Sequence, residues 1–190
     1  RVLFRSLVCH RLFAYLLSAD LLPTYQSAYR PNHSTETATL RVLSDILQFV
    51  DEGDVAVLVL LALSSAFDTV DHGSLLRRLK VSFGITGPAL DWLRSYLTGR
   101  TQYTRLGTHR SPISFLTCNV PQGTVLGPVL FLLYSADLQD IIIKHSLCPH
   151  LYADDTQIYG SCHPNDIDQL KERVSTCIDE VAGWMRANRL

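Results

Sequence analysis

Two adjacent carboxylates, Asp154 and Asp155, stand between two strand-like segments, and this arrangement constrains the fold more than any other feature of the chain. Residues 147–152 and 156–159 favour the two strands of a β-hairpin, with the sequence Tyr152-Ala153-Asp154-Asp155 at its bend. Two carboxylates held this close repel each other unless a multivalent cation lies between them. The hairpin therefore predicts a magnesium site, with a solvated Asp-Asp turn as the simpler alternative.

Hydrophobic periodicity predicts most of the other elements. Apolar residues at helical spacing indicate long helices over 1–22, over 34–50 and from Asn165 onward, and shorter helices near 74–81 and 88–99. Residues 101–106 and 113–118 predict a second hairpin, and the apolar stretch 129–138 predicts a buried helix. We expect helices on one face of an antiparallel sheet, which is an α+β fold.

The longest apolar run, residues 55–63, predicts a buried strand. It is far shorter than the ~20 residues that a membrane-spanning helix needs. The charged residues spaced along the first helix also argue against a signal peptide, which requires an unbroken apolar stretch.

Three further motifs precede the acidic turn. In chain order they are Gln26-Ser27-Ala28-Tyr29-Arg30 leading into His33-Ser34-Thr35-Glu36, then Leu63-Ser64-Ser65-Ala66-Phe67-Asp68-Thr69-Val70-Asp71-His72, then Val120-Pro121-Gln122-Gly123-Thr124-Val125-Leu126-Gly127-Pro128. Together with the turn, they resemble the reverse transcriptase of non-LTR (LINE-type) retrotransposons from about Leu21 to Leu190. The resemblance implies a polymerase palm over about 55–190 and part of the fingers over about 1–54, with the thumb and endonuclease absent.

The resemblance also implies roles for individual residues. Asp154 and Asp155 match the second and third catalytic carboxylates, which hold two Mg²⁺ ions in the family. Phe67 matches the aromatic gate beneath the incoming sugar, where its ring excludes a ribose 2′-hydroxyl. An ordinary core phenylalanine is the alternative interpretation of Phe67.

Four more residues match positions that meet the nucleotide. Gln122 and Gly123 match the loop that contacts nucleotide and template, for which a plain helix-entry turn is the alternative. Arg30 matches a basic position of the fingers near the triphosphate. Without the resemblance, the simpler interpretation is a surface arginine. The backbone carbonyl of Leu63 matches a group that faces the nucleotide's metal.

The chain departs from the family at Ala62, where the resemblance places the first catalytic aspartate. That carboxylate is the one expected to bridge both ions, and a methyl group coordinates nothing. Asp68 lies roughly 20 Å further along an extended chain, so it could not substitute without a backbone rearrangement. Asp71 is more typical of the cap of the helix that follows it. We therefore expect this chain to polymerise poorly or not at all.

The net charge of −1 argues against nucleic-acid binding by the chain taken as a whole. The charge is unevenly distributed, because seven basic residues and a single acid, Asp91, lie between Arg77 and Arg110. This stretch predicts a surface that follows a phosphate backbone, with a solvated basic face as the alternative.

The five cysteines are scattered without a Cys-x-x-Cys pair, which is typical of reduced thiols in an intracellular protein. The spacing of Cys148, His150, Cys162 and His163 fits no usual zinc pattern.

The resemblance thus implies an RNA-directed DNA polymerase that uses Mg²⁺ and takes an RNA template, a DNA primer and dNTPs. It further implies association with the rest of a retroelement polyprotein in a nuclear or cytoplasmic ribonucleoprotein, without a membrane. Two alternatives stay open. One is a non-catalytic nucleic-acid-binding remnant, and the other is a decayed retroelement copy without activity.

Overall fold

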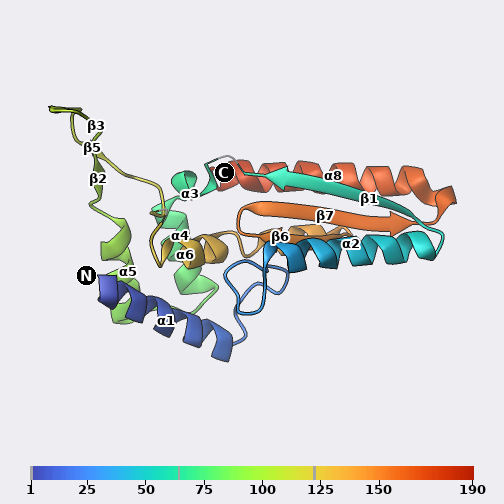
Figure 1. Cartoon of the computed structure of the whole chain (residues 1–190), viewed down its shortest axis with the longest axis horizontal. Helices are drawn as coiled ribbons and strands as arrows, with labels where there is room; N and C mark the ends of the chain where they lie inside the picture. The colour runs from blue at the N-terminus through green and yellow to red at the C-terminus, as the bar shows by residue number, and fades with distance from the viewer. Residues whose placement is uncertain (1, 64, 122) are drawn as a thin grey trace. The chain divides into compact units, whose positions relative to one another are not determined.

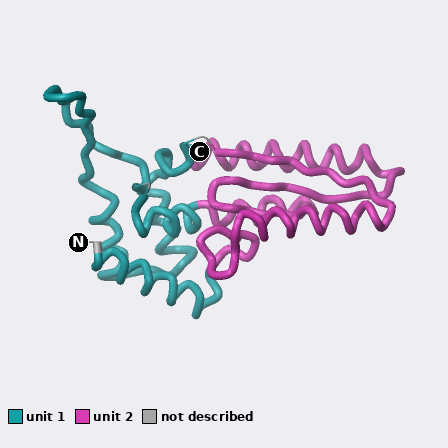
Figure 2. Tube along the Cα trace, viewed as in Figure 1, with its two compact units in different colours: residues 1–21, 65–134, 189 teal, residues 22–64, 135–188, 190 magenta. Residues whose placement is uncertain are grey.

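The computed structural model describes residues 2–63, 65–121 and 123–190, which form two compact units. Unit 1 contains the described residues up to Leu21, those of 65–134, and Arg189; unit 2 contains those of 22–64, 135–188 and Leu190 (Figure 2). Each unit is therefore assembled from segments that are distant in sequence. None of the helices in the described ranges is both long enough and apolar enough to cross a membrane.

Unit 2 is built around a three-stranded antiparallel sheet in the order β1-β7-β6 (Figure 1). The strands are β1 (Val55–Ala62), β6 (Cys148–Tyr152) and β7 (Asp155–Cys162). The hairpin predicted around the two acids is confirmed, since β6 and β7 pair from Cys148 with Tyr159 to Tyr152 with Asp155.

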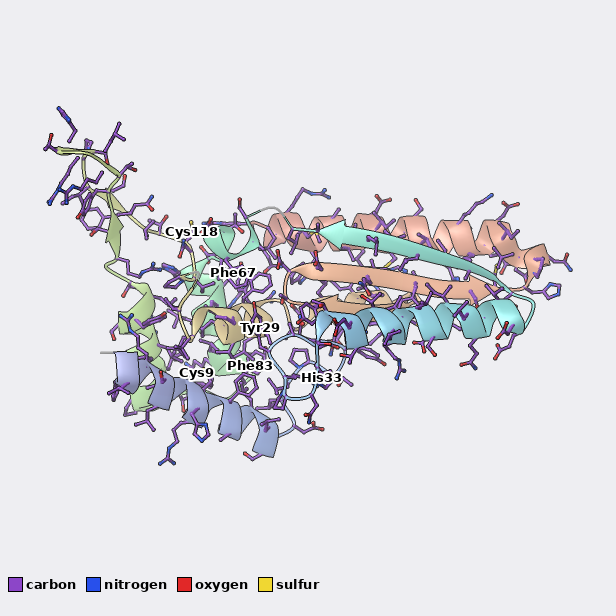
Figure 3. The ribbon with its side chains drawn as sticks, viewed as in Figure 1. Cys9, Tyr29, His33, Phe67, Phe83 and Cys118 are labelled. Carbon is purple, nitrogen blue, oxygen red and sulfur yellow. The ribbon has the colours of Figure 1, made fainter. Side chains whose placement is uncertain are left out.

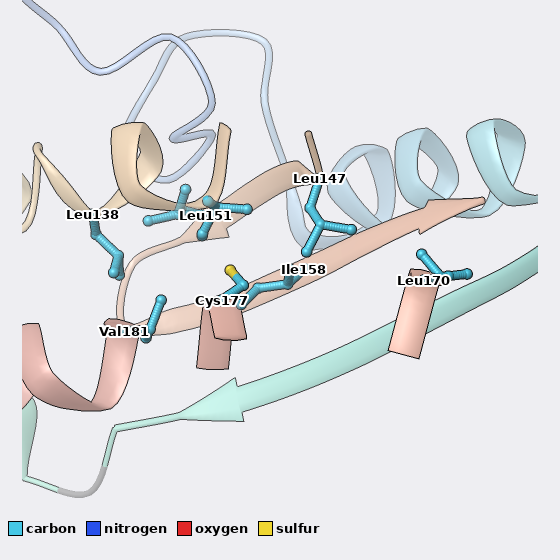
Figure 4. Packing of buried hydrophobic residues seen from close by; sticks show 8 residues of the cluster. Leu138, Leu147, Leu151, Ile158, Leu170, Cys177 and Val181 are labelled. Atoms are coloured by element: carbon cyan, nitrogen blue, oxygen red, sulfur yellow. The ribbon is translucent and has the colours of Figure 1, made fainter. Parts of the chain in front are cut away.

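One face of this sheet is covered by two helices, α7 (Leu138–Lys144) and α8 (Ile167–Ala187). A short 3₁₀ turn, Pro164–Asp166, leads into α8 close to the start predicted at Asn165. The two helices and the sheet share one buried apolar cluster (Figure 4), whose members are Leu138, Ile142, Leu147, Leu151, Ile158, Leu170, Cys177 and Val181.

The helix α2 (Thr35–Asp51) lies against the opposite face of the sheet. Because side chains alternate along a strand, Tyr159 points away from the cluster that contains Ile158, and its hydroxyl donates a hydrogen bond to Asp45 of α2 at 2.6 Å. A capping box between Ser34 and Thr37 begins α2, which confirms the predicted start at residue 34 or 35.

The strand β1 is not the buried strand that its apolar sequence predicted. Leu58 is 43% exposed and Leu60 is 67% exposed, and β1 contains no fully buried residue. It forms the edge of the sheet, and only the face that carries Val57, Val59 and Leu61 packs against the core. An apolar run indicates side chains that favour burial, but it does not show which helices or strands are present to cover them.

Unit 1 is mainly helical. Its helices are α1 (Val2–Ser18), α3 (Ala66–Thr69), α4 (His72–Val81), α5 (Gly87–Leu97) and α6 (Gly127–Tyr134). The α1 helix ends before the predicted boundary at residue 22. The buried helix predicted over 129–138 is confirmed as α6, although it ends at Tyr134, before α7 of unit 2 begins.

The second predicted hairpin is also present in unit 1. Strand β2 (Thr101–Gln102) pairs with β5 (Ser114–Phe115), and β3 (Arg105–Leu106) pairs with β4 (His109–Arg110). Each strand has only two residues, and all of these residues are exposed. We call residues 99–119 the basic hairpin.

Candidate active site

The bend that carries the two acids is a two-residue loop, Ala153 and Asp154, between paired residues Tyr152 and Asp155. Ala153 has a φ of 54°, as the first loop residue of a type II′ hairpin turn does. The left-handed region costs a residue with a β-carbon about 1–2 kcal/mol, because the β-carbon approaches the following carbonyl oxygen. The bend is therefore held in a strained conformation by the groups around it.

Position 62 lies directly beside this bend. In the antiparallel register of β1 and β7, Ala62 is the cross-strand partner of Asp155. The β-carbons of such partners are about 4.5–5.5 Å apart. The structure thus brings Ala62, Asp154 and Asp155 together, and a carboxylate at position 62 would join the other two.

The side chains present do not complete a two-metal centre. Among the described residues, no group of three or more His, Cys, Asp or Glu side chains could hold a metal ion. Asp154 and Asp155 supply two carboxylates, whereas position 62, to which the resemblance assigns the bridging carboxylate, carries a methyl group. The donor set therefore does not fit the two-ion site that the family resemblance implied.

Two residues near the bend had no predicted role. The buried side chain of Gln26 hydrogen-bonds both the N–H and the C=O of Ala153. Tyr29, which is labelled in Figure 3, is itself in a left-handed conformation with φ of 60°. It lies near enough to Asp154 to be affected by its charge. Burial raises the pKa of the Tyr29 phenol, and the negative charge of Asp154 raises it further. Both residues belong to the first of the four sequence motifs, and this motif is the sequence signal that could have identified them.

Two other predicted site residues are in the same unit. Arg30 donates a hydrogen bond from Nη2 to the carbonyl oxygen of Pro23 at 2.5 Å, which ties together the loop before α2. Leu63 immediately follows β1 and is partly buried. Gln122, predicted to meet the nucleotide, lies outside the described residues.

The remaining predicted site residues, Phe67 and Gly123, belong to unit 1. Phe67, which is labelled in Figure 3, is a partly buried residue of α3. Its ring stacks on that of Phe131, with centroids 4.6 Å apart. Gly123 has a φ of 70°, and a β-carbon there would meet no heavy atom within 4 Å. Its backbone conformation favours glycine, and the space beside it is open.

The two acids of the second motif, Asp68 and Asp71, both hydrogen-bond to other residues of unit 1. Asp71 caps α4, since its Oδ1 accepts from the backbone N–H of Ser74 at 2.8 Å, and this hydrogen bond lowers the pKa of Asp71. The prediction that Asp71 caps this helix is thus confirmed. Asp68 accepts a hydrogen bond from Asn119 at 2.8 Å.

Comparison with known proteins gives a consistent picture. The family model described as reverse transcriptase (RNA-dependent DNA polymerase) matches residues 4–190. The probable RNA-directed DNA polymerase from transposon BS of Drosophila melanogaster is 31% identical over 95% of this chain, and the one from transposon X-element of the same species is 33% identical over 71%. The chain spans 19% and 15%, respectively, of the length of these relatives.

Solved structures resemble the chain in fold. The apo telomerase of Candida Tropicalis, truncated from its C-terminal domain, aligns with a TM-score of 0.62 over 92% of this chain and 37% of the telomerase chain. The telomerase of Candida albicans, solved with a fragment of telomeric RNA, gives a TM-score of 0.59 over 90% of this chain and 32% of its own. Identity is 12% in both cases, so the likeness is one of fold, and it supports the expected palm-like α+β architecture.

Proposed function

Because this chain belongs to the reverse transcriptase family and its motifs are those of the non-LTR type, we propose that it is an RNA-directed DNA polymerase domain whose nucleotidyl transfer is impaired. The observation that carries the proposal is the cross-strand pairing of Ala62 with Asp155. If position 62 is that of the family's first catalytic carboxylate, as the resemblance implies, this pairing puts a methyl group beside the two acids in its place. Losing a ligand shared by two catalytic ions costs at least about a thousandfold in rate.

Divalent metal ions are general to this family, and Mg²⁺ is the ion we propose for this chain. Asp154 and Asp155 would supply its carboxylate ligands, because hard cations prefer oxygen donors. Two carboxylates bind such an ion more weakly than three. The chain's own side chains therefore support weak cation binding at the bend rather than a complete two-metal reaction.

The remaining site residues keep the roles that the resemblance implied, as proposals. Phe67, Gln122, Gly123, Arg30 and the carbonyl of Leu63 would contact the incoming dNTP. The partners would be an RNA template, a DNA primer and the rest of a retroelement polyprotein. The open space beside Gly123, which lets a backbone approach a substrate closely, supports its part of this assignment.

The basic hairpin supports contact with a nucleic-acid backbone. Residues 99–119 contain Arg100, Arg105 and Arg110 and no acidic residue. The guanidinium of Arg110 lies 5.2 Å from the ring centre of Tyr103, which is 51% exposed. Exposed cations next to an aromatic ring suit phosphates and unstacked bases. This hairpin also favours a second candidate function, a nucleic-acid-binding domain without catalysis.

Primer extension separates the two functions. With a primed RNA template and Mg²⁺ or Mn²⁺, the wild-type chain should extend slowly or not at all, and Ala62→Asp should extend at least about a thousandfold faster. Ala62→Asn is the matched control, since asparagine has nearly the same shape as aspartate but carries no charge. Equal rates for the wild type and both variants would show that residue 62 is not a catalytic position. Salt-dependent binding of an RNA–DNA hybrid without extension by any variant would support the second function.

A further inference from the structure

Unit 1 carries an apolar groove between α1 and α5, with a volume of about 670 Å³. The aromatic residues that line it are Phe4, Tyr15 and Trp92. The rings of Phe4 and Trp92 meet edge to face with centroids 5.6 Å apart. The hydroxyl of Tyr15 donates to the carbonyl oxygen of Phe83 at 2.8 Å, which ties α1 to the loop after α4. The groove follows α1 from Phe4 to Tyr15, a length of roughly 16 Å or about three helical turns.

The rim of this groove is basic. Arg11 is one of its lining residues, and the guanidinium of Arg5 lies 5.2 Å from the centre of an aromatic ring of α5. The sequence of α1 contains no acidic residue. The sequence of α5 contains Asp91, which is balanced by Arg94. An apolar ligand with negative charges along its sides therefore matches both the lining and the rim of the groove.

Helix α2 of unit 2 presents a surface of this kind. Its exposed face carries apolar residues at alternating spacings of three and four, each between 47% and 62% exposed, which we call the apolar stripe: Leu40, Leu43, Leu47 and Val50. This spacing is typical of helices that pack lengthwise with interlocking side chains. From Leu40 to Val50 the stripe extends roughly 15 Å, which matches the length of the groove.

The charges of α2 complement those around the groove. Asp51 and Glu52 lie beside the apolar stripe, since they line the same surface hollow as its leucines. The one basic residue in the sequence of α2, Arg41, is paired with Asp45 at 3.2 Å. Pairing two stripes would put two negatively charged helices together, and pairing two grooves would put two positively charged rims together. Contact between a groove and a stripe is therefore the electrostatically favoured combination.

We propose that the groove of one copy of this chain binds the apolar stripe of a second copy. The leucines of the stripe enter the groove as anchors, and the acids beside them approach Arg11 at its rim. Each copy carries both a groove and a stripe, so the contact joins unlike surfaces. It forms twice in a closed dimer, or once between successive copies of an open chain. This association does not depend on polymerase activity.

Sedimentation velocity of the full chain over a concentration series tests the association. The wild type should self-associate. Leu47→Ser in the stripe should raise the dissociation constant about tenfold or more, because burial of one leucine side chain contributes at least that much. Leu7→Ser in the groove should do the same. Leu7 lines the groove and is 53% exposed, so neither substitution opens a core.

Leu60→Ser is the matched control for these two variants. Leu60 is also an exposed leucine, but it belongs to the edge strand β1 and lies outside both surfaces. Its replacement should leave the dissociation constant within about twofold of the wild-type value, below the effect of losing a buried anchor.

Mixing the two variants shows whether the groove and the stripe contact each other. Leu47→Ser keeps an intact groove, and Leu7→Ser keeps an intact stripe. The chain has two tryptophans, of which Trp92 lines the groove and Trp184 packs against the core cluster of unit 2. In ¹⁵N-labelled Leu47→Ser, added unlabelled Leu7→Ser should shift the indole N–H signal of Trp92 and leave that of Trp184 unchanged. Added unlabelled Leu47→Ser should shift neither signal.

Three results would overturn the inference. One is a wild-type chain that stays monomeric across the concentration series. Another is a loss of association in Leu60→Ser but not in Leu47→Ser, which would show pairing along the edge of β1 instead. The third is an unchanged Trp92 signal in the mixture of the two variants. If only Leu47→Ser prevents association and Leu7→Ser does not, α2 binds a surface other than the groove and the inference also fails.

Discussion

Ala62 is the cross-strand partner of Asp155. The residue that determines whether a third carboxylate is present therefore lies on the strand that pairs directly with the acidic bend. Both strands are parts of a single sheet, which fixes this relationship through the backbone rather than through side-chain packing. A substitution at position 62 therefore changes a side chain directly beside the acidic bend.

The stability of Ala62→Asp should depend on divalent cations. Without them, a third carboxylate beside Asp154 and Asp155 adds like-charge repulsion, and we expect a loss of about 1 kcal/mol, or roughly 2–4 °C in Tm. Saturating Mg²⁺ or Mn²⁺ should reverse this loss, since a ligand at about 100 times its Kd adds ~2.7 kcal/mol. Thermal unfolding with EDTA and with added cation measures the effect. Ala62→Asn should show almost no such dependence, and a cation response equal to that of Ala62→Asp would contradict the prediction.

Replacing Gly127 by alanine should destabilise unit 1 by about 1–3 kcal/mol. A β-carbon at Gly127 would collide with the backbone carbonyl oxygen of Pro121, which cannot rotate away as a side chain can. Urea unfolding measures the change. Gly183→Ala is the matched control: it lies within α8, where the nearest atom to an added β-carbon is the flexible end of Arg186 at 3.9 Å. That variant should be neutral or more stable by up to ~1 kcal/mol.

The protein should lose stability in mild acid through His150. The residue is 7% exposed, and its Nε2 lies 3.2 Å from the Ser27 hydroxyl. It lines a pocket of about 380 Å³ with Arg41 and Tyr159. Burial lowers the pKa of His150, and the nearby positive charge of Arg41 lowers it further.

Because the pKa of His150 in the folded state is below its unfolded value of about 6.5, the neutral ring stabilises the fold above that pH. This stability is lost as the pH falls through the folded pKa. Urea unfolding between pH 8 and pH 5 should therefore show a steeper decline for the wild type than for His150→Gln, which does not titrate. Parallel pH profiles would rule out this contribution.

Arg110→Ala in the basic hairpin should weaken binding of an RNA–DNA hybrid and reduce the slope of log K against log salt by about one. The arginine is exposed and packs over Tyr103, so its loss removes a phosphate contact without opening a core. Lys171→Ala is the control, an exposed cation of α8 that lies 3.3 Å from Asp168. Fluorescence anisotropy across a salt series measures both. An unchanged slope for Arg110→Ala would show that Arg110 does not contact a phosphate of the nucleic acid.

Local chemistry explains which parts of the fold could be predicted from the sequence. The start of α2 depends on Ser34 and Thr37, which are three residues apart, and the cap of α4 depends on Asp71 and Ser74. The acidic hairpin likewise requires only neighbouring strands and a short bend. Each of these elements is stabilised by residues that are close in sequence, so patterns within a short window were sufficient.

The features that were missed depend on distant segments. Gln26 and Ala153 are 127 positions apart, and no periodicity connects them. The strand β1 was expected to be buried, but one of its faces is exposed, and the apolar residues Leu43 and Leu47 of α2 are also 47% and 53% exposed. Their hydrophobicity was visible in the sequence, whereas the absence of a covering layer in the described structure depends on tertiary arrangement.

The edge position of β1 has a practical consequence for work in solution. Within the described sheet this strand pairs only with β7, so the N–H and C=O groups along its outer side can extend the ladder to another molecule. Leu60, which is 67% exposed, would add apolar contact to such a pairing. Self-association would then remove free monomer as the sample is concentrated. Kinetic comparisons among variants of this domain are meaningful only at matched, low protein concentrations.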